Sequence, residues 1–431
     1  AIIAKQLGHE VTGSDKNLYD PMKSVLKNEQ INFTEGYNPR FLKQSIDLVI
    51  VGNVMSRGMD IIERLLDSNI KYISGPQWLY ENVLSKKYVI AVSGTHGKTT
   101  TSSLVAWVLK YSGLNPSYLI GGQPMNLNSP AKLTKSKYFV IEADEYDTSF
   151  FDKRSKYIHY KPDILVINNI EFDHADIFEN INHIERHFHH LVRTIPKIGK
   201  IIFNNKSNSI KRVIKMGCWS DLEDFGGTGK WSYRKINDTE FEISFKRNIQ
   251  GSVKWDLIGH HNSLNALAAI AAAQHIGISP KNAINSLGKF KSVKKRMEFL
   301  TSINKIDIYD DFAHHPTAIK TTLEGLRKKI GNNRIIAVIE PRSNTMKLGK
   351  MKNQLVKSLK EADIIFCYSK NLTWNPKILF KNLTNTKVFL DIDKLADKIK
   401  KSCKQGDTII FMSNGGFSDL QNKVKQLLKN E

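Results

Sequence analysis

Short apolar runs alternate with amphipathic segments along the first part of the chain. The chain opens with a helical pattern that leads into the run HEVTGSD, and two further runs follow, DLVIVGN at 47–53 and KYISGP at 71–76. Strands that alternate with helices are typical of parallel βαβ units. We therefore expect residues 1–85 to form a first α/β domain around a parallel sheet.

A second α/β domain is expected over residues 86–298. It begins with an apolar run at 88–93, a glycine-bearing loop, and a helix at about 99–112 whose apolar residues recur on one face. Two more strands at 138–142 and 164–168 and an Ala-rich helix at 262–275 continue the domain. The basic segment GKFKSVKKRMEF marks its end.

A third α/β rhythm fills residues 299–431. Apolar runs predict strands at 308–310, 334–339, 363–367, 386–390 and 408–413. Helical patterns fill the gaps between them, which indicates a Rossmann-like sheet. The predicted fold class is therefore α/β, with three such domains in series.

Length and composition agree with a multidomain globular protein. A chain of 431 residues exceeds the size of one ordinary hydrophobic core. No run approaches the roughly 18 to 20 apolar residues that cross a bilayer, so we expect no membrane insertion. The cysteines Cys218, Cys367 and Cys403 show neither metal-ligand nor disulfide spacing, which favours a reducing, cytoplasmic compartment.

The net charge of +22 would suit nucleic acid or an anionic substrate. The basic residues, however, are mostly lysines scattered among Asn and Ile, and they are not gathered with aromatic residues. This pattern favours a solvated Lys-rich surface, so we expect no nucleic acid partner. The alternative, an ATPase that acts on nucleic acid, would predict stimulation by DNA.

A phosphate-binding loop is the most specific motif in the sequence. An apolar run, a glycine turn and a helix N-terminus present backbone N–H groups to phosphate. The motif consists of Gly94, Thr95, His96, Gly97, Lys98, Thr99 and Thr100. Lys98 is predicted to hold the β and γ phosphates of ATP, and Thr99 to bind Mg²⁺. Val92 stands where the general pattern has its first glycine, which leaves the shorter spacing GTxGKT.

Acidic and histidine side chains follow two further predicted strands. The segment FVIEADEYD delivers Glu142 with three more carboxylates, and EFDHAD delivers His174. The carboxyl ends of strands in α/β sheets bind ligands, and carboxylates there can hold Mg²⁺. A solvated acidic loop is the alternative, but the phosphate loop favours Glu142 as a metal ligand and His174 as a second one. The run HIERHFHH lacks the HExxH form of a zinc site.

Several segments together resemble the Mur ligase family across essentially the whole chain. They are GTHGKTTT, the strand with Glu142, EFDHAD, GHHNSLNALAA, KKRMEF and DDFAHHP, in the family's order and spacing. The resemblance implies an ATP-dependent ligase that activates a carboxylate as an acyl phosphate and joins it to an amine. It also implies a Rossmann-like N-terminal domain, a central ATPase domain, and a Rossmann-like C-terminal domain that binds the amine substrate.

The resemblance also implies roles for individual residues. ATP and Mg²⁺ would be bound by Lys98, Thr99, Glu142 and His174, and the nucleotide base would lie near His261, Asn262 and Asn265. ATP would also be reached by Arg296 from the hinge and by Asp310 from the third domain, while the acyl phosphate or the amine would be positioned by His314. The peptide carboxylates would be bound by Arg342 and Asn344, and the UDP-sugar cleft would be lined by Ser14, Asp15 and Asn53. Two alternatives stay open. The segment around Asn262 could be only a capped core helix, and Arg296 only one of several cations in a linker.

Within the family, other segments are similar to the branch that acts on a salvaged cell-wall tripeptide. They are EADEYDTSFFDKRSKYIHY, EFDHADIF, FHHLVRTIP, GCWS, EPRSNTMK and MSNGGF. That branch joins UDP-N-acetylmuramic acid to L-Ala-γ-D-Glu-meso-diaminopimelate. The alternatives are the alanine-adding branch and a nucleotide-binding module without ligase activity. Relatives carry a strand and a glycine-rich turn for the UDP diphosphate ahead of the helix entered at Ala1, so we expect the first domain to lack them here.

Overall fold

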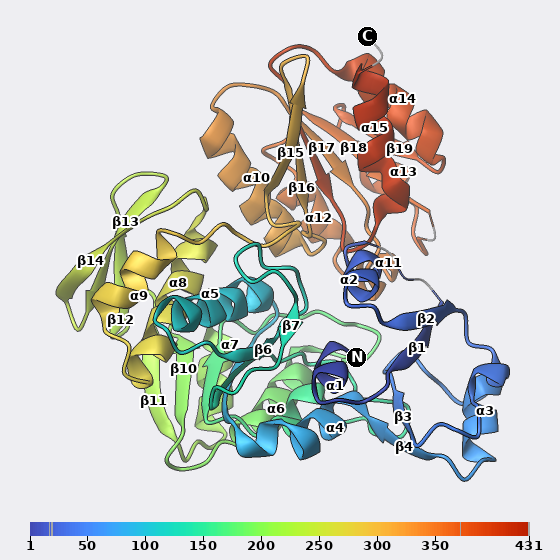
Figure 1. Cartoon of the computed structure of the whole chain (residues 1–431). Coiled ribbons are helices and arrows are strands. Elements are labelled where there is room, and N and C mark those ends of the chain that lie inside the picture. The colour runs from blue at the N-terminus through green and yellow to red at the C-terminus, as the bar shows by residue number, and fades with distance from the viewer. Residues whose placement is uncertain (17, 19, 371, 430–431) are drawn as a thin grey trace.

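The computed structural model describes residues 1–16, 18, 20–370 and 372–429. Figure 1 shows three α/β parts that follow one another along the chain: the blue N-terminal elements lie beside the cyan-to-yellow middle part, and the orange-to-red C-terminal part lies above it. Within the described residues, no helix is both long enough and apolar enough to cross a membrane.

Among its described residues, the N-terminal part contains four strands and four α-helices. In chain order they are α1 (Ile2–Gln6), β1 (Thr12–Asp15), α2 (Met22–Asn28), β2 (Asn32–Glu35), β3 (Leu48–Val51), α3 (Asp60–Leu66), β4 (Lys71–Ser74) and α4 (Gly75–Asn82). The expectation of one parallel sheet was wrong in this respect. Strands β1 and β2 form one parallel pair and β3 and β4 another, because no strand among the described residues pairs with both β1 and β3.

The middle part is built on a ten-stranded sheet, in the order β14-β13-β12-β11-β10-β9-β5-β8-β6-β7. Its strands are β5 (Tyr88–Ser93), β6 (Ser117–Leu119), β7 (Ala131–Lys132), β8 (Tyr138–Glu142), β9 (Ile164–Ile167), β10 (Lys200–Asn204), β11 (Asp221–Phe225), β12 (Trp231–Lys235), β13 (Glu240–Phe245) and β14 (Asn248–Lys254). The strands predicted at 88–93, 138–142 and 164–168 are confirmed. Residues 224–256, a basic and glycine-bearing region in which we predicted no strand from the sequence, form most of β11 to β14.

Helices cover both faces of this sheet, which explains why its central strands are largely apolar. The helices are α5 (Lys98–Tyr111), α6 (Ile181–Val192), α7 (Asn208–Lys215), α8 (His260–His275) and α9 (Pro280–Leu287). Along β5, Ile90 and Val92 pack into the core that contains α5 and α8. Val89 and Ala91 point to the other face and pack into the core that contains α4 and α6. Strand β5 is thereby held rigidly from both sides.

The C-terminal part is a six-stranded sheet, in the order β15-β16-β20-β17-β18-β19, with helices around it. The strands are β15 (Glu298–Ile303), β16 (Ile306–Asp311), β17 (Ile335–Ile339), β18 (Ile364–Tyr368), β19 (Thr386–Phe389) and β20 (Thr408–Met412). The helices are α10 (Pro316–Ile330), α11 (Asn344–Lys347), α12 (Lys352–Ser358), α13 (Pro376–Leu379), α14 (Ile392–Ser402) and α15 (Leu420–Lys429). All five predicted strands are confirmed. The antiparallel edge strand β15 was not foreseen.

Candidate active site

The phosphate loop leaves the carboxyl end of β5 and enters α5. Because β5 pairs in parallel with both β8 and β9, the segments that follow these three strands meet at one edge of the sheet. The loop after β9 holds the phosphate loop in place: Thr95 N–H donates to the Asn169 carbonyl (3.1 Å), and His96 N–H donates to Asn169 Oδ1 (2.8 Å). The structure thus places the phosphate loop beside the segment that follows β9.

Two glycines of this loop occupy positions that a side chain could not. Gly94 has φ +128, and a Cβ there would lie 2.9 Å from the Asn169 carbonyl oxygen. Gly97 has φ +79, and a Cβ there would lie 2.7 Å from Asn265 Oδ1. Positive φ and close approach both select glycine. The cradle that these residues leave suits a phosphate group at the N-terminus of α5.

Lys98 is buried at the start of α5 and is paired with two carboxylates. Its Nζ lies 2.8 Å from Glu145 Oε2 and 3.6 Å from Asp144 Oδ1, and it also donates to the Gly94 carbonyl (2.8 Å). Burial opposes the charge, but Glu145 and Asp144 outweigh it and raise the pKa of Lys98. Burial likewise opposes the charge of Glu145, yet Lys98 and His174 lower the pKa of Glu145 to about 2. The ammonium group of Lys98 therefore stays charged and can bind an anionic phosphate.

Thr99 and Glu142 form a pair of oxygen donors beside Lys98. The Thr99 hydroxyl donates to Glu142 Oε1 (2.9 Å), and Glu142 Oε2 accepts from Gly121 N–H (2.7 Å). Neighbouring ligands of an octahedral Mg²⁺ with bonds of about 2.0–2.1 Å lie about 2.9 Å apart. The spacing and the chemistry of this pair thus fit Mg²⁺. Burial and the charge of Asp144 raise the pKa of Glu142, and a bound cation would counter that effect.

His174 lies on the other side of Glu145. Its Nε2 is 3.0 Å from Glu145 Oε1, and its ring packs against Tyr146 at a tilt of 50°, with centroids 4.1 Å apart. Burial opposes the charged imidazole, but Glu145 outweighs burial and raises the pKa of His174. The backbone of His174 has φ +54, a left-handed conformation that is uncommon for a residue other than glycine. Such strained positions cluster at functional sites.

The residues predicted to meet the nucleotide base lie at the start of α8. The Asn262 amide donates to the Ile258 carbonyl (2.9 Å), and Asn265 packs against Gly97 of the phosphate loop. Burial, together with the charge of Arg296, lowers the pKa of His261 to about 4. Arg296 reaches from the hinge to Thr99, with Nη2 3.4 Å from the hydroxyl oxygen. The structure therefore brings Arg296 and Asn265 to the phosphate loop.

The predicted residues of the C-terminal part lie at the carboxyl ends of β16 and β17. Asp310 accepts from the Gln421 amide (3.1 Å), and burial raises the pKa of Asp310 to about 6. His314 Nδ1–H donates to the Phe312 carbonyl (3.0 Å), and burial lowers the pKa of His314 to about 4. Asn344 donates to Asp176 of the middle part (2.7 Å). Arg342 lies across Gly415, where a Cβ would meet its guanidinium.

The predicted sugar-cleft residues lie in the N-terminal part. Ser14 and Asp15 end β1, and the Tyr37 hydroxyl donates to Asp15 Oδ1 (3.2 Å). Asn53 is exposed just after β3. These three residues therefore lie at the carboxyl ends of strands, as the sequence predicted, but in two separate strand pairs.

Two residues that the sequence did not single out, Glu145 and Thr345, connect the predicted site residues to one another. Glu145 pairs with both Lys98 and His174, although it was only one of four acidic residues in its motif. Thr345 donates to Asp173 Oδ1 (2.8 Å) and accepts from Ala175 N–H (3.0 Å), which links the C-terminal part to the segment EFDHAD. The motif position of Glu145 was a usable signal. Nothing local in the sequence indicated the contact of Thr345.

Comparisons with known proteins agree with this geometry. The Mur ligase middle domain family matches residues 92–273, and the Mur ligase, glutamate ligase domain family matches residues 295–415. The UDP-N-acetylmuramate–L-alanyl-gamma-D-glutamyl-meso-2,6-diaminoheptandioate ligase of Escherichia coli (strain K12) is 47% identical over 429 residues, which cover 98% of this chain and 94% of the relative. A UDP-N-acetylmuramate–L-alanine ligase of Dictyoglomus turgidum is 29% identical over 436 residues, covering 96% of this chain and 91% of that relative.

A solved structure supports the same relationship. The crystal structure of a murein peptide ligase from Psychrobacter arcticus superimposes with a TM-score of 0.80 and is 42% identical. The match covers 100% of this chain and 96% of that one. Fold and sequence identity agree over nearly the whole length, and the chain therefore belongs to the Mur ligase family.

Proposed function

We propose that this protein joins the lactyl carboxylate of UDP-N-acetylmuramic acid to the amine of L-Ala-γ-D-Glu-meso-diaminopimelate, with conversion of ATP to ADP and phosphate. The observation that carries the proposal is the 47% identity, over 98% of the chain, to a ligase named for these two substrates. The identity to a relative named for L-alanine is lower, at 29%. We therefore favour the tripeptide over L-alanine as the amine substrate of this protein.

The reaction has two steps. A carboxylate oxygen first attacks the γ-phosphorus of ATP, so that an acyl phosphate forms and ADP leaves. The amine then attacks the acyl carbon, phosphate leaves, and the amine nitrogen loses a proton. Both steps bring anions together, so their barrier falls when cations and N–H groups screen the charge.

Residues of the sheet edge would perform this screening. Lys98 would exchange part of its pairing with Glu145 for the β and γ phosphates, and the N–H groups of the phosphate loop would hold the phosphate oxygens. Thr99 and Glu142 would hold Mg²⁺, which when bound neutralises phosphate charge. Arg296 would reach the same phosphates from the hinge. His174 would join the metal ligands only after release from Glu145 and loss of its proton.

The remaining assignments follow the same division of labour. We assign the middle part to ATP, with His261, Asn262 and Asn265 near the base. In the C-terminal part, we assign Asp310 to ATP and His314 to the acyl phosphate or the amine. We assign Arg342 and Asn344 to the peptide carboxylates, because guanidinium and amide groups match them geometrically. Ser14, Asp15 and Asn53 would line the UDP-sugar cleft. Asn344 would have to leave Asp176 when the peptide binds.

The test is phosphate release from ATP and Mg²⁺ in the presence of UDP-N-acetylmuramic acid and one amine. Release with the tripeptide and not with L-alanine is expected. Release with L-alanine alone would assign the protein to the alanine-adding reaction. Release with neither amine, in protein that still binds ATP, would overturn the ligase proposal.

A further inference from the structure

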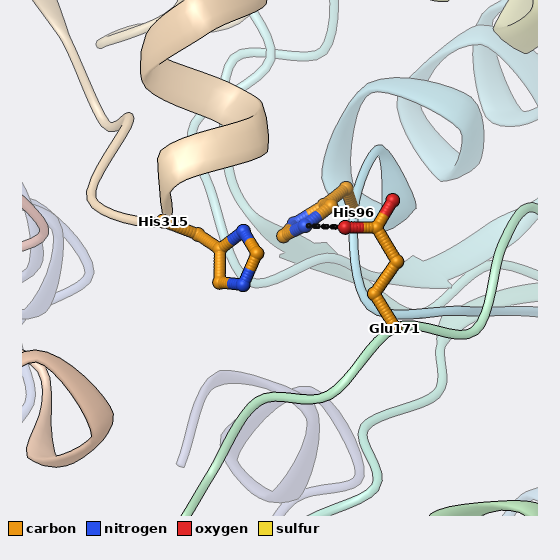
Figure 2. A group of neighbouring side chains, drawn as sticks. All are labelled: His96, Glu171 and His315. Carbon is orange, nitrogen blue, oxygen red and sulfur yellow. Dashed lines mark ion pairs between the residues drawn. The ribbon is translucent and has the colours of Figure 1, made fainter. Parts of the chain in front are cut away.

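Three potential metal ligands from distant parts of the chain converge beside the phosphate loop. His96 belongs to that loop, Glu171 to the segment after β9, and His315 is the N-cap residue of α10 in the C-terminal part. One ligand atom from each lies within 4.8 Å of the other two. Figure 2 shows the two imidazoles and the carboxylate gathered around a common space, with His315 at the beginning of its helix.

The donor set distinguishes this cluster from the Thr99–Glu142 pair. Two imidazoles and one carboxylate suit Zn²⁺ and similar transition metals better than Mg²⁺, which prefers oxygen ligands such as those of Thr99 and Glu142. In a tetrahedral zinc site with bonds of about 2.0–2.1 Å, neighbouring ligand atoms lie about 3.4 Å apart. His96 Nε2 and Glu171 Oε2 lie 3.5 Å apart, close to that spacing. His315 would have to approach by a small side-chain movement.

Hydrogen bonds around the cluster hold two of the ligands in suitable orientations. The Thr317 hydroxyl donates to Glu171 Oε2 (2.7 Å), and His315 Nε2–H donates to the Phe172 carbonyl (3.3 Å). Because Nε2 of His315 makes this bond, Nδ1 is the nitrogen that would bind the metal. To do so, Nδ1 would give up its long hydrogen bond from Thr317 N–H (3.3 Å). His96 Nε2 is buried and has no hydrogen-bond partner within the described residues. Metal-binding imidazoles commonly donate a hydrogen bond from the nitrogen that does not bind the metal, as His315 Nε2–H does to the Phe172 carbonyl.

We propose that His96, Glu171 and His315 form a transition-metal site of the Zn²⁺ class that bridges the middle and C-terminal parts and is separate from the Mg²⁺ pair. Two of its ligands belong to the middle part and one to the C-terminal part, so a bound ion ties the two together. Ligases of this kind must open to release products. The ion would thus slow turnover, a consequence that rests on the proposed ligase function.

The first test measures Zn²⁺ binding directly, without turnover. The protein is titrated with Zn²⁺ in excess Mg²⁺ against a chromophoric chelator. The variants His315→Asn and Glu171→Gln each remove a ligand, while Asn keeps the N-cap of α10 and Gln keeps an acceptor for Thr317. We expect one tight site in the unmodified protein and at least about tenfold weaker binding in both variants.

The control is His187→Gln on α6, where the ring of His187 lies against those of His183 and His190. This variant should leave the tight site unchanged. Equal Zn²⁺ affinity in the unmodified protein, His315→Asn and Glu171→Gln would overturn the proposal, as would loss of the site in His187→Gln alone. Unchanged thermal unfolding of each variant without Zn²⁺ excludes misfolding as the cause.

A second measurement addresses the functional consequence. Zn²⁺ should inhibit ATP-dependent phosphate release by the unmodified protein, and the inhibition constant for His315→Asn, relative to its own zinc-free rate, should rise at least about tenfold. Zn²⁺ binding without inhibition would keep the site and reject its effect on turnover. A failure of the ligase assay itself would leave the binding result standing, so the two proposals fail separately.

Discussion

Lys98 is a buried cation between two carboxylates, and this pairing sets the chemistry of the phosphate loop. Its side chain is only 10% exposed, so water stabilises its charge poorly, and Glu145 and Asp144 do so instead. Phosphate oxygens can replace those partners without leaving the cation unpaired. The charge therefore stays in place before and after ATP binds.

Replacement of Lys98 by Ala should abolish turnover while the fold persists. The variant removes the cation that screens the transferring phosphoryl group, and loss of one such contact commonly costs about 10²–10³ in kcat. Phosphate release with both substrates measures the effect. Lys110→Ala, an exposed position on the same helix, serves as the control and should retain its rate. Near-normal turnover by Lys98→Ala would show that the assigned ATP site is wrong.

Asp310 is predicted to cost stability at neutral pH. Burial raises the pKa of Asp310 from its ordinary value of 3.8 to about 6, so the folded state holds this proton more tightly than the unfolded state does. The free energy of unfolding therefore falls as pH rises from about 4 to about 6 and stays lowered above that range. Asp310→Asn removes the penalty and keeps an acceptor for Gln421.

Urea unfolding at a series of pH values tests this prediction. Asp310→Asn should be more stable than the unmodified protein by up to roughly 2–3 kcal/mol at pH 7 to 8, and the difference should vanish near pH 4. Asp307→Asn, a half-exposed position on the same strand, should show no such gain. A pH-independent difference for Asp310→Asn would contradict the assignment.

At the scale of single elements, helix α5 has a glycine with positive φ at each end, but the two have different surroundings. Gly97 at its N-terminus has φ +79 and touches Asn265, whereas Gly113 after its C-terminus has φ +81 and no atom within 4 Å of a built Cβ. Both glycines permit the left-handed conformation. Only Gly97 also permits close packing between the phosphate loop and α8.

Substitution of each glycine by Ala separates these two requirements. Both variants should lose about 1–2 kcal/mol of stability through backbone strain. Gly97→Ala should additionally weaken ATP binding more than about tenfold, because its Cβ displaces the phosphate loop from Asn265, while Gly113→Ala should bind ATP normally. Calorimetric titration with ATP and chemical denaturation measure the two effects. Equal ATP affinity in the two variants would refute the role given to Gly97.

At the scale of the whole molecule, the middle and C-terminal parts are joined by side-chain contacts as well as by the hinge. Thr345 of α11 is buried and bonds to Asp173 and to Ala175 N–H, in the segment that carries His174. Asn344 adds a contact with Asp176. The loop assigned to the peptide is thus connected to the segment beside Lys98.

Thr345→Val keeps the shape of this side chain but removes its hydrogen bonds. The loss leaves Ala175 N–H unpaired, at a cost of about 1–3 kcal/mol to the interface. We expect faster tryptic cleavage at the exposed hinge residues Lys291 and Lys294, because the two parts separate more often. Thr373→Val, whose hydroxyl bonds to Lys347 within the C-terminal part, is the control. Unchanged cleavage of Thr345→Val would show that the hinge alone holds the parts together.

The sequence by itself determined the features that depend on local pattern. Strands β5, β8 and β9 were predictable because their apolar runs are buried on both faces, and the phosphate loop because its glycines, Lys98 and Thr99 are adjacent in the chain. It also placed Glu142 and His174 at strand ends that meet at one edge of the sheet. It did not predict the strands of 224–256, where turns and antiparallel pairing replace the βα rhythm.

Only the tertiary structure decided which side chains meet. The choice of Glu145 over Glu142 as the partner of Lys98 depends on where each carboxylate points after β8, because four acidic residues in one short segment are equivalent by type. The convergence of His96, Glu171 and His315 requires two separate parts to pack together. Chemical type is written residue by residue, whereas distance between remote residues arises from long-range packing, which no local pattern encodes.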